Sequence, residues 1–311
     1  MKKIFMLFVA AAMTAGTVFA QDINAVTETY NNGAMELDMG NKEAALGYFQ
    51  TALTEAEALG EAGAAIVDNC KATIPVLMIS IAKDYIGADQ FDAASELLVK
   101  AEETANLYGD ATKAAEAKAL ANQVLMAKAN ELLKAKDYPG AIAVYSQLME
   151  ADPTNAMAAL RLGQAYAATG DNDKAEEALN VAAANGQEKQ ANKQLSTIYV
   201  KKAAASLKAK NTQEAFDFAV KSNEYLENAT ALKVAGQAAM ALGKSAEALP
   251  FLEKYVELSP NAKDANQMKF NIAATAQKLG DKEKAKNYYE QVLGDPKFGA
   301  AAKQQYDALN K

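Results

Sequence analysis

The chain has 311 residues, half of them hydrophobic, and 32 Lys and Arg residues against 39 Asp and Glu residues give a formal net charge of −7. It contains no His, which removes the commonest general base and zinc ligand, and a single Arg, which argues against a nucleic-acid surface. With only 6 Pro and 17 Gly and one Cys, the composition favours helix throughout and excludes an intramolecular disulfide.

Residues 1–20 have the pattern of a secretory signal peptide. Lys2 and Lys3 form a basic start, residues 4–15 an apolar run, and residues 18–20 a small-residue cleavage site before Gln21. The apolar run is shorter than a typical membrane-spanning helix, and no Cys stands at the junction to carry a lipid. We therefore expect an exported bacterial protein without a membrane span, in the periplasm, with the cell surface or secretion as the alternative.

The stretch from 157 to 179 predicts one complete helix–turn–helix unit. Leu160 and Tyr166 belong to an apolar pattern with helical spacing. Gly163 lies inside that helix, where Gly costs about 1 kcal/mol relative to Ala, so we expect a neighbouring helix to pass close to it. Gly170 is placed to end the helix in the left-handed conformation, and Asp173 is placed to cap the next helix.

The same spacing recurs along the chain, as a small residue followed twelve positions later by Ala across a polar turn. The pairs are Gly33 with Ala45, Ala82 with Ala94, Ala129 with Ala141, Gly163 with Ala175, Ala203 with Ala215, Gly236 with Ala248, and Ala273 with Ala285. In all but one repeat a large apolar residue follows four positions after the second Ala; Ala219 is the exception. We interpret this pattern as seven helix–turn–helix repeats that cover nearly all of the mature chain.

Residues of the unit at 157–179 carry a family resemblance: Leu162, Gly163, Tyr166, Gly170, Ala175 and Leu179. The pattern resembles the tetratricopeptide repeat, whose unit is about 34 residues, with Ala159 where that family often has Trp. The resemblance implies an all-α superhelix, or solenoid, of about seven repeats. It also implies that the first helices of successive repeats line a concave groove.

The repeat spacing changes along the chain. Ala45, Ala94 and Ala141 are 49 and 47 residues apart, whereas the later spacings run from 33 to 40. We therefore expect TPR-like repeats with lengthened helices over 21–154, and more regular repeats over 155–311 that end in a capping helix at 298–309. Pro75 is expected at the first position of a helix, and Cys70 as a small buried residue.

The patterns that resemble catalytic motifs favour structural roles. Residues 243–245 read Gly-Lys-Ser, like the end of a phosphate-binding loop, but Ala238 stands where that motif needs its first Gly. Glu176 and Glu177 are adjacent on a predicted helix, so they point apart and are expected to be solvated. We predict no catalytic activity, no cofactor, no metal and no nucleic-acid partner.

The resemblance places a set of side chains on the concave face. The predicted partner-binding residues are Gln123, Met126, Asn130, Gln164, Lys233, Gln237, Gln267 and Phe270, and the same wall includes Tyr30, Lys83, Met157 and Met240. Amides can pair with the backbone of an extended peptide, and Met adapts to loosely specified apolar side chains. The alternative is a solvated inner wall with Met in the core.

The resulting functional prediction is a non-catalytic protein–protein interaction scaffold of the cell envelope, which binds a partner or an extended peptide in the groove. The clamp by which co-chaperone members of the family hold a terminal carboxylate is matched only by Asn130 and Lys233. One alternative is a glycan or small-ligand binder that uses Tyr30, Tyr85 and Phe270. Another is a self-assembling protein with an exposed apolar patch at one end.

Overall fold

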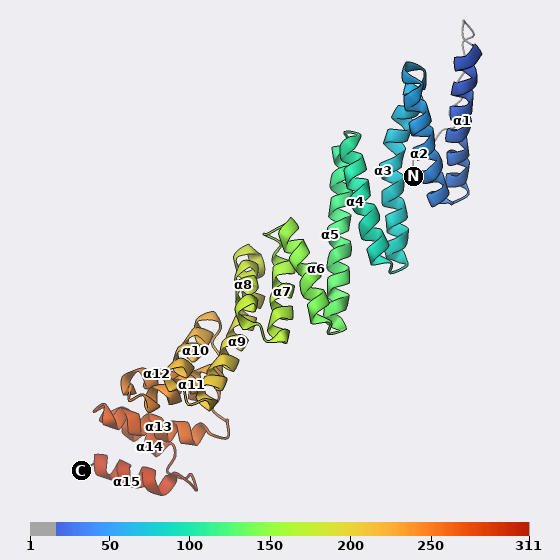
Figure 1. The fold of residues 1–311 in the computed structure, drawn as a ribbon. Coiled ribbons are helices and arrows are strands. Elements are labelled where there is room, and N and C mark those ends of the chain that lie inside the picture. The colour runs from blue at the N-terminus through green and yellow to red at the C-terminus, as the bar shows by residue number, and fades with distance from the viewer. Residues whose placement is uncertain (1–16, 311) are drawn as a thin grey trace. The chain divides into compact units, whose positions relative to one another are not determined.

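The computed structural model describes residues 17–310, and within them it contains helices and no strand, as predicted (Figure 1). The helices are α1 (Thr17–Asp38), α2 (Lys42–Ala58), α3 (Ala64–Gly87), α4 (Phe91–Leu107), α5 (Ala111–Lys134), α6 (Tyr138–Ala151), α7 (Ala156–Thr169), α8 (Asn172–Ala182), α9 (Glu188–Lys208), α10 (Thr212–Tyr225), α11 (Ala229–Ala241), α12 (Ser245–Leu258), α13 (Ala265–Lys278), α14 (Lys282–Glu290) and α15 (Gly299–Leu309). Short helical turns occupy Gly60–Gly63 (η1) and Ala183–Gln187 (η2). Most of the predicted signal peptide lies outside the described residues, so export stays a prediction.

Consecutive helices form seven pairs, from α1 with α2 to α13 with α14, and α15 packs on α14 at the C-terminal end (Figure 1). This confirms the predicted solenoid of about seven helix–turn–helix repeats. In each of the seven residue pairs, the small residue lies on the first helix of a repeat and the Ala lies on the second helix. All the Ala residues in these pairs are fully buried. The sequence pattern therefore marks the closest approach between the helices of a repeat.

The buried Gly residues show how close that approach is. A Cβ atom added at Gly163 would lie 2.6 Å from Cγ of Leu179, and one added at Gly236 would lie 2.5 Å from Cδ2 of Leu252. At these two Gly residues the nearest neighbour is the large apolar residue four positions after the repeat Ala, rather than the Ala itself. Ala175 contributes its carbonyl oxygen, 3.1 Å from the added atom at Gly163.

One turn conformation joins the two helices of every repeat. The residue seven positions after the small residue has a positive φ in each case: Gly40, Asp89, Lys136, Gly170, Lys210, Gly243 and Gly280. The next residue then donates its N–H to a carbonyl five residues earlier, as Asn211 does to Ser206 at 2.9 Å. These are the features of the Schellman motif, which satisfies carbonyls left free at a helix end.

The predicted helix cap after Gly170 was wrong by two residues. Asp171, not Asp173, caps α8, and its Oδ1 accepts a hydrogen bond from the N–H of Lys174 at 3.3 Å. The turn is so short that the residue closing the first helix also begins the second. Asp173 instead lies in the first turn of α8 and forms an ion pair with Lys202.

The chain divides into two compact units, one up to Leu148 and one from Met149. The core of the first unit includes Phe49, Ile66, Ile74, Ile81 and Leu98. Cores in the second unit include Leu179, Leu195, Leu252, Met268 and Tyr289. The predicted domain limits at 154 and 155 rest on repeat spacing and stay a prediction.

Helix α3 begins at Ala64 and is longer than predicted. Pro75, which was expected at the first position of this helix, lies inside it. Pro75 cannot donate to the carbonyl four residues earlier, yet it is buried among apolar neighbours that hold the helix. Within the described residues, one helical segment, Gly60–Gly87, is long and apolar enough to cross a membrane by length and composition, and 44% of its apolar window is buried. Its Ile66, Ile74 and Cys70 belong to the core of the first unit, where burial raises the pKa of the Cys70 thiol to about 12.

Candidate functional site

A groove in the second unit runs between α7 and α9, the first helices of two consecutive repeats. Its volume is about 570 Å³, and its lining consists of Met157, Leu160, Arg161, Gln164, Ala167, Ala168, Gln187, Gln190, Lys193, Gln194, Thr197, Ile198 and Lys201. The helices α8 and α9 are joined by the bend η2, in which Gly186 has a φ of +100°. This bend replaces a loop and places Gln187 at the end of the groove.

The α7 wall combines an apolar floor with a fixed cation. Leu160 is 5% exposed and contributes to the core, while Met157 is 42% exposed. Arg161, one turn along the helix, donates from Nη1 to Oε1 of Gln164 at 2.9 Å. This hydrogen bond restricts the guanidinium, so its remaining N–H groups have a defined orientation beside the groove.

The α9 wall presents one polar stripe. Gln190, Gln194, Thr197 and Lys201 follow each other at intervals of four, three and four residues, which is the spacing of a single helix face. The side chain of Ile198, 4% exposed, lies below them. The stripe therefore lies on the same helix as core residues but on its outward-facing side.

The lining is cationic and contains neither a carboxylate nor an aromatic ring. Its charged residues are Arg161, Lys193 and Lys201. Lys193 and Lys201 are exposed and form no ion pair with any residue in 17–310. A groove with these properties differs in charge from the chain as a whole, whose formal charge is −7.

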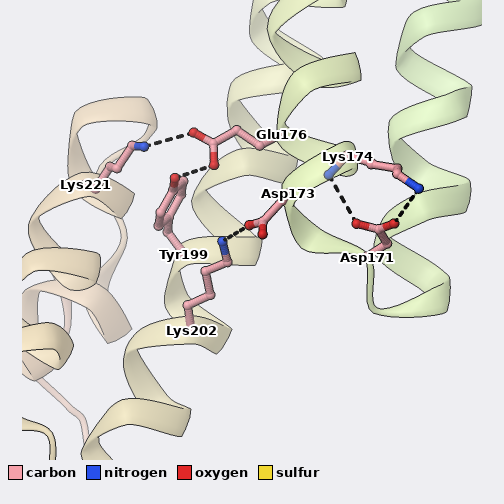
Figure 2. A network of polar contacts seen from close by, with 7 residues as sticks. All are labelled: Asp171, Asp173, Lys174, Glu176, Tyr199, Lys202 and Lys221. Carbon is pink, nitrogen blue, oxygen red and sulfur yellow. Dashed lines mark hydrogen bonds and ion pairs between the residues drawn. The ribbon is translucent and has the colours of Figure 1, made fainter.

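The side of α9 away from the groove is held by a polar network with α8 and α10 (Figure 2). Tyr199 donates its hydroxyl to Glu176, and Lys221 donates to the other oxygen of the same carboxylate at 2.9 Å. The amino group of Lys221 also lies 4.5 Å from the centre of the Tyr199 ring. Lys202 completes the network with an ion pair to Asp173 at 3.0 Å.

Electrostatics keeps Glu176 ionised and Tyr199 protonated at neutral pH. Burial alone would raise the pKa of Glu176, but the hydrogen bonds from Tyr199 and Lys221 outweigh burial and lower it. Burial and the bond to Glu176 raise the pKa of Tyr199 to about 12. Glu176 was predicted to be solvated, and this was wrong: its side chain is 19% exposed because α8, α9 and α10 pack around it.

Of the eight predicted partner-binding residues, Gln164 lines this groove. The four on α11 and α13 lie elsewhere in the second unit. Lys233 forms an ion pair with Asp264 at 3.1 Å, and Gln237 lies 3.9 Å from the sulfur of Met268. Gln267 is exposed, whereas Phe270 packs on Tyr289 and Phe298 with ring centres 5.5 and 5.6 Å apart.

The remaining three predicted residues lie on α5 in the first unit. Gln123 is exposed, Met126 is half-buried, and Asn130 accepts a hydrogen bond from Tyr145 at 2.7 Å. Asn130 and Lys233 thus both have partners within the protein, and neither is placed as a free member of a carboxylate clamp.

The aromatic residues expected on the inner wall do not form a stacking surface. Tyr30 was predicted to be exposed, and this was wrong: it is 2% exposed and packs on Phe49, with ring centres 5.2 Å apart. Tyr85 lines a smaller hollow of about 260 Å³ in the first unit, beside Glu43 and Glu96. Neither hollow offers the paired rings that the glycan alternative requires.

Sequence reasoning did not select Arg161, Lys193 or Lys201. Two signals were available: Arg161 is the only Arg in the chain, and Lys193 and Lys201 belong to a helix rich in Lys. No group of three or more potential metal ligands occurs among residues 17–310. The groove thus offers amides and cations for noncovalent binding.

These helix pairs, which repeat one turn and one interhelical contact, define the class of helical repeat proteins. Models of the tetratricopeptide repeat match residues 132–197, 213–263 and 267–294. These three segments are therefore tetratricopeptide repeats, as the sequence pattern predicted.

Solved structures that match part of the chain include the MamA protein and YrrB. MamA is 20% identical, with 58% of this chain and 94% of that chain covered and a TM-score of 0.36. YrrB, described as a TPR protein with an unusual peptide-binding site, is 19% identical, with 58% and 91% covered and a TM-score of 0.34. A search of curated proteins gave no match.

Proposed function

We propose that this protein is a non-catalytic scaffold of the cell envelope and that it binds an extended segment of a partner protein in the groove between α7 and α9. The tetratricopeptide repeat fold supports protein–protein interaction, which gives the general class. The particular site and the cellular location are the proposal.

The observation that carries the groove proposal is its set of Gln side chains. Gln164 projects from α7, and Gln187, Gln190 and Gln194 from η2 and α9. Each amide offers both a donor and an acceptor, which is what the N–H and C=O groups of an extended backbone require. Met157, exposed at the rim, supplies an adaptable apolar contact for side chains of varied shape.

The groove is long enough for a short extended segment. Its lining on η2 and α9 runs from Gln187 to Lys201, which corresponds to about 21 Å at 1.5 Å per residue. An extended chain advances about 3.3 Å per residue, so the groove spans about six residues of a bound segment. This length favours recognition of a peptide segment over recognition of a single small molecule.

The envelope location rests on the signal-peptide pattern of residues 1–20. Its test is mass spectrometry of the protein purified from the native host, with cells fractionated beforehand. A mature N-terminus at Gln21 in the periplasmic fraction is expected. An unprocessed chain in the cytoplasm would refute the location and leave the groove proposal untouched.

The groove is tested by a photo-crosslinking residue placed at Gln194 in the native host. The matched control is the same residue at Gln213, which is exposed on α10, the second helix of the repeat that contains α9. A discrete protein adduct from Gln194 alone, mapped to one segment of that partner and reproduced with both purified proteins, is expected. Adducts from both positions, or only self-adducts, would refute groove binding and indicate assembly, and the absence of protein adducts would favour a small ligand.

A further inference from the structure

We infer that the segment bound between α7 and α9 is acidic, with carboxylate side chains that meet Arg161, Lys193 and Lys201. The inference rests on the proposed function, because it names the chemistry of the segment that the groove would bind. It starts from the charge of the lining, which has three cations and no carboxylate.

The charge of the groove is a local property of its two helices. Arg161 is the one charged residue of α7, and α9 carries five Lys and one Glu. That Glu, Glu188, is exposed in the first turn of α9 and does not line the groove. A cationic surface within a chain of formal charge −7 attracts anionic partners selectively, since the rest of the surface repels them.

Lys residues on the two sides of α9 differ in whether they form ion pairs within the protein. On the side toward α8 and α10, Lys202 is paired with Asp173, and Lys221 of α10 is paired with Glu176 (Figure 2). On the groove side, Lys193 and Lys201 have no such partner within residues 17–310. Lys202 and Lys221 are therefore neutralised by carboxylates within the protein, whereas Lys193 and Lys201 remain available to a ligand.

The geometry also gives a spacing for the acidic residues. Lys193 and Lys201 are eight residues apart on one helix, which places them about 12 Å apart along its axis. In an extended segment this distance corresponds to about four residues, and residues i and i+4 point to the same side of such a segment. Arg161, on the opposite wall, is oriented by Gln164 and offers the planar donor geometry that a carboxylate accepts.

The test uses the mature chain from Gln21 and an array of 12-residue peptides of random composition. The peptides that bind are expected to be enriched in Asp and Glu, with pairs spaced by four residues over-represented. For the best acidic peptide, fluorescence anisotropy should give a Kd at least about tenfold lower than for the same peptide with Gln in place of Glu. This advantage should shrink between 20 and 200 mM salt, because exposed ion pairs are screened.

The variants separate the groove from general charge. Lys193→Gln with Lys201→Gln should remove most of the preference for the acidic peptide. The matched control, Lys189→Gln with Lys208→Gln, removes the same charge from exposed positions of α9 outside the groove and should retain the preference. Circular dichroism checks that both variants fold, and Lys193→Arg with Lys201→Arg should restore binding.

Three results would overturn the inference: no enrichment of acidic residues among bound peptides, equal loss in both double variants, or no peptide binding at all. In each case the crosslinking experiment at Gln194 decides the proposed function separately. A partner captured there through a neutral segment would leave groove binding intact and refute only the acidic ligand. Acidic enrichment with adducts from both faces would instead place the acidic segment on a second copy of the chain or elsewhere.

Discussion

Replacement of Gly236 by Ala tests the interhelical contact that the repeat pattern encodes. Gly236 is buried in the middle of α11, and an added Cβ would lie 2.5 Å from Cδ2 and 2.6 Å from Cγ of Leu252 on α12. Leu252 is fully buried, so its side chain cannot move without displacing core neighbours. The nearest backbone atom, the nitrogen of Leu252, is 3.4 Å from the added atom, so the conflict is with the side chain.

Two effects of opposite sign determine the result. Overpacking of a core costs about 1–3 kcal/mol, whereas Ala in place of Gly within a helix gains about 0.8–1 kcal/mol. The expected net result for Gly236→Ala is a loss of about 0–2 kcal/mol in the free energy of unfolding. With Leu252→Ala already in place, the conflict is absent, and the same substitution should stabilise by about the helix-propensity gain.

The chain supplies a matched control in Gly47, an exposed Gly inside α2 with nothing within 4 Å of an added Cβ. Gly47→Ala should therefore stabilise by about 0.8–1 kcal/mol. Urea unfolding followed by circular dichroism at 222 nm gives the midpoints, with the slope compared between variants to detect loss of cooperativity. If Gly236→Ala stabilises as much as Gly47→Ala, the close contact between α11 and α12 does not exist and the reasoning fails.

Two further predictions concern the turn and the polar network. Lys210 has a φ of +65°, a conformation that costs a non-Gly residue about 1–2 kcal/mol. Lys210→Gly should therefore raise the midpoint of urea unfolding, and Gly170→Ala should lower it. Equal effects of the two substitutions would contradict the turn assignment. The pKa of Glu176 is lowered from 4.5 in the folded state, so its contribution to stability is present above pH 4.5 and is lost as pH falls through the folded-state pKa. Glu176→Gln should reduce the free energy of unfolding at pH 7 by about 1–3 kcal/mol, and the variant should lose less stability on acidification than the original protein. Urea unfolding at pH 7, 5 and 3 measures both effects. If the variant loses as much stability between pH 7 and 3 as the original protein, the network is refuted.

Much of the fold could be predicted from the sequence because the determinants are local. One helix pair contains a small residue, a turn seven positions later and an Ala five positions after the turn. Their spacing can therefore be recognised without knowledge of the rest of the chain. Lys210 shows the limit of reading residue types: it occupies the left-handed position that Gly170 fills in the preceding repeat, and only its place in the pattern reveals the turn. Asp173 shows that the sequence locates a helix start only to within about two residues, since the residue that caps α8 is Asp171.

The candidate site was predicted less well because it depends on register between repeats. Gln164 was placed on the inner wall and lines the groove, and its role in partner binding stays a prediction. Lys193 and Lys201 line the groove from α9, which follows the bend η2, and they were not selected because the repeat pattern does not mark this bend. Tyr30 was misjudged for another reason: its large ring packs on Phe49 instead of remaining exposed.

The two faces of α9 explain why a structural network matters to a binding groove. Tyr199, on the face toward α8 and α10, is fixed by Glu176 and Lys221, and these contacts hold α9 against both helices. Because Gln194 and Lys201 are carried by the same rigid helix, their side chains start from fixed backbone positions before any ligand binds. Binding then has less conformational entropy to lose, and a groove without deep apolar pockets can still select an extended segment by amides and charge.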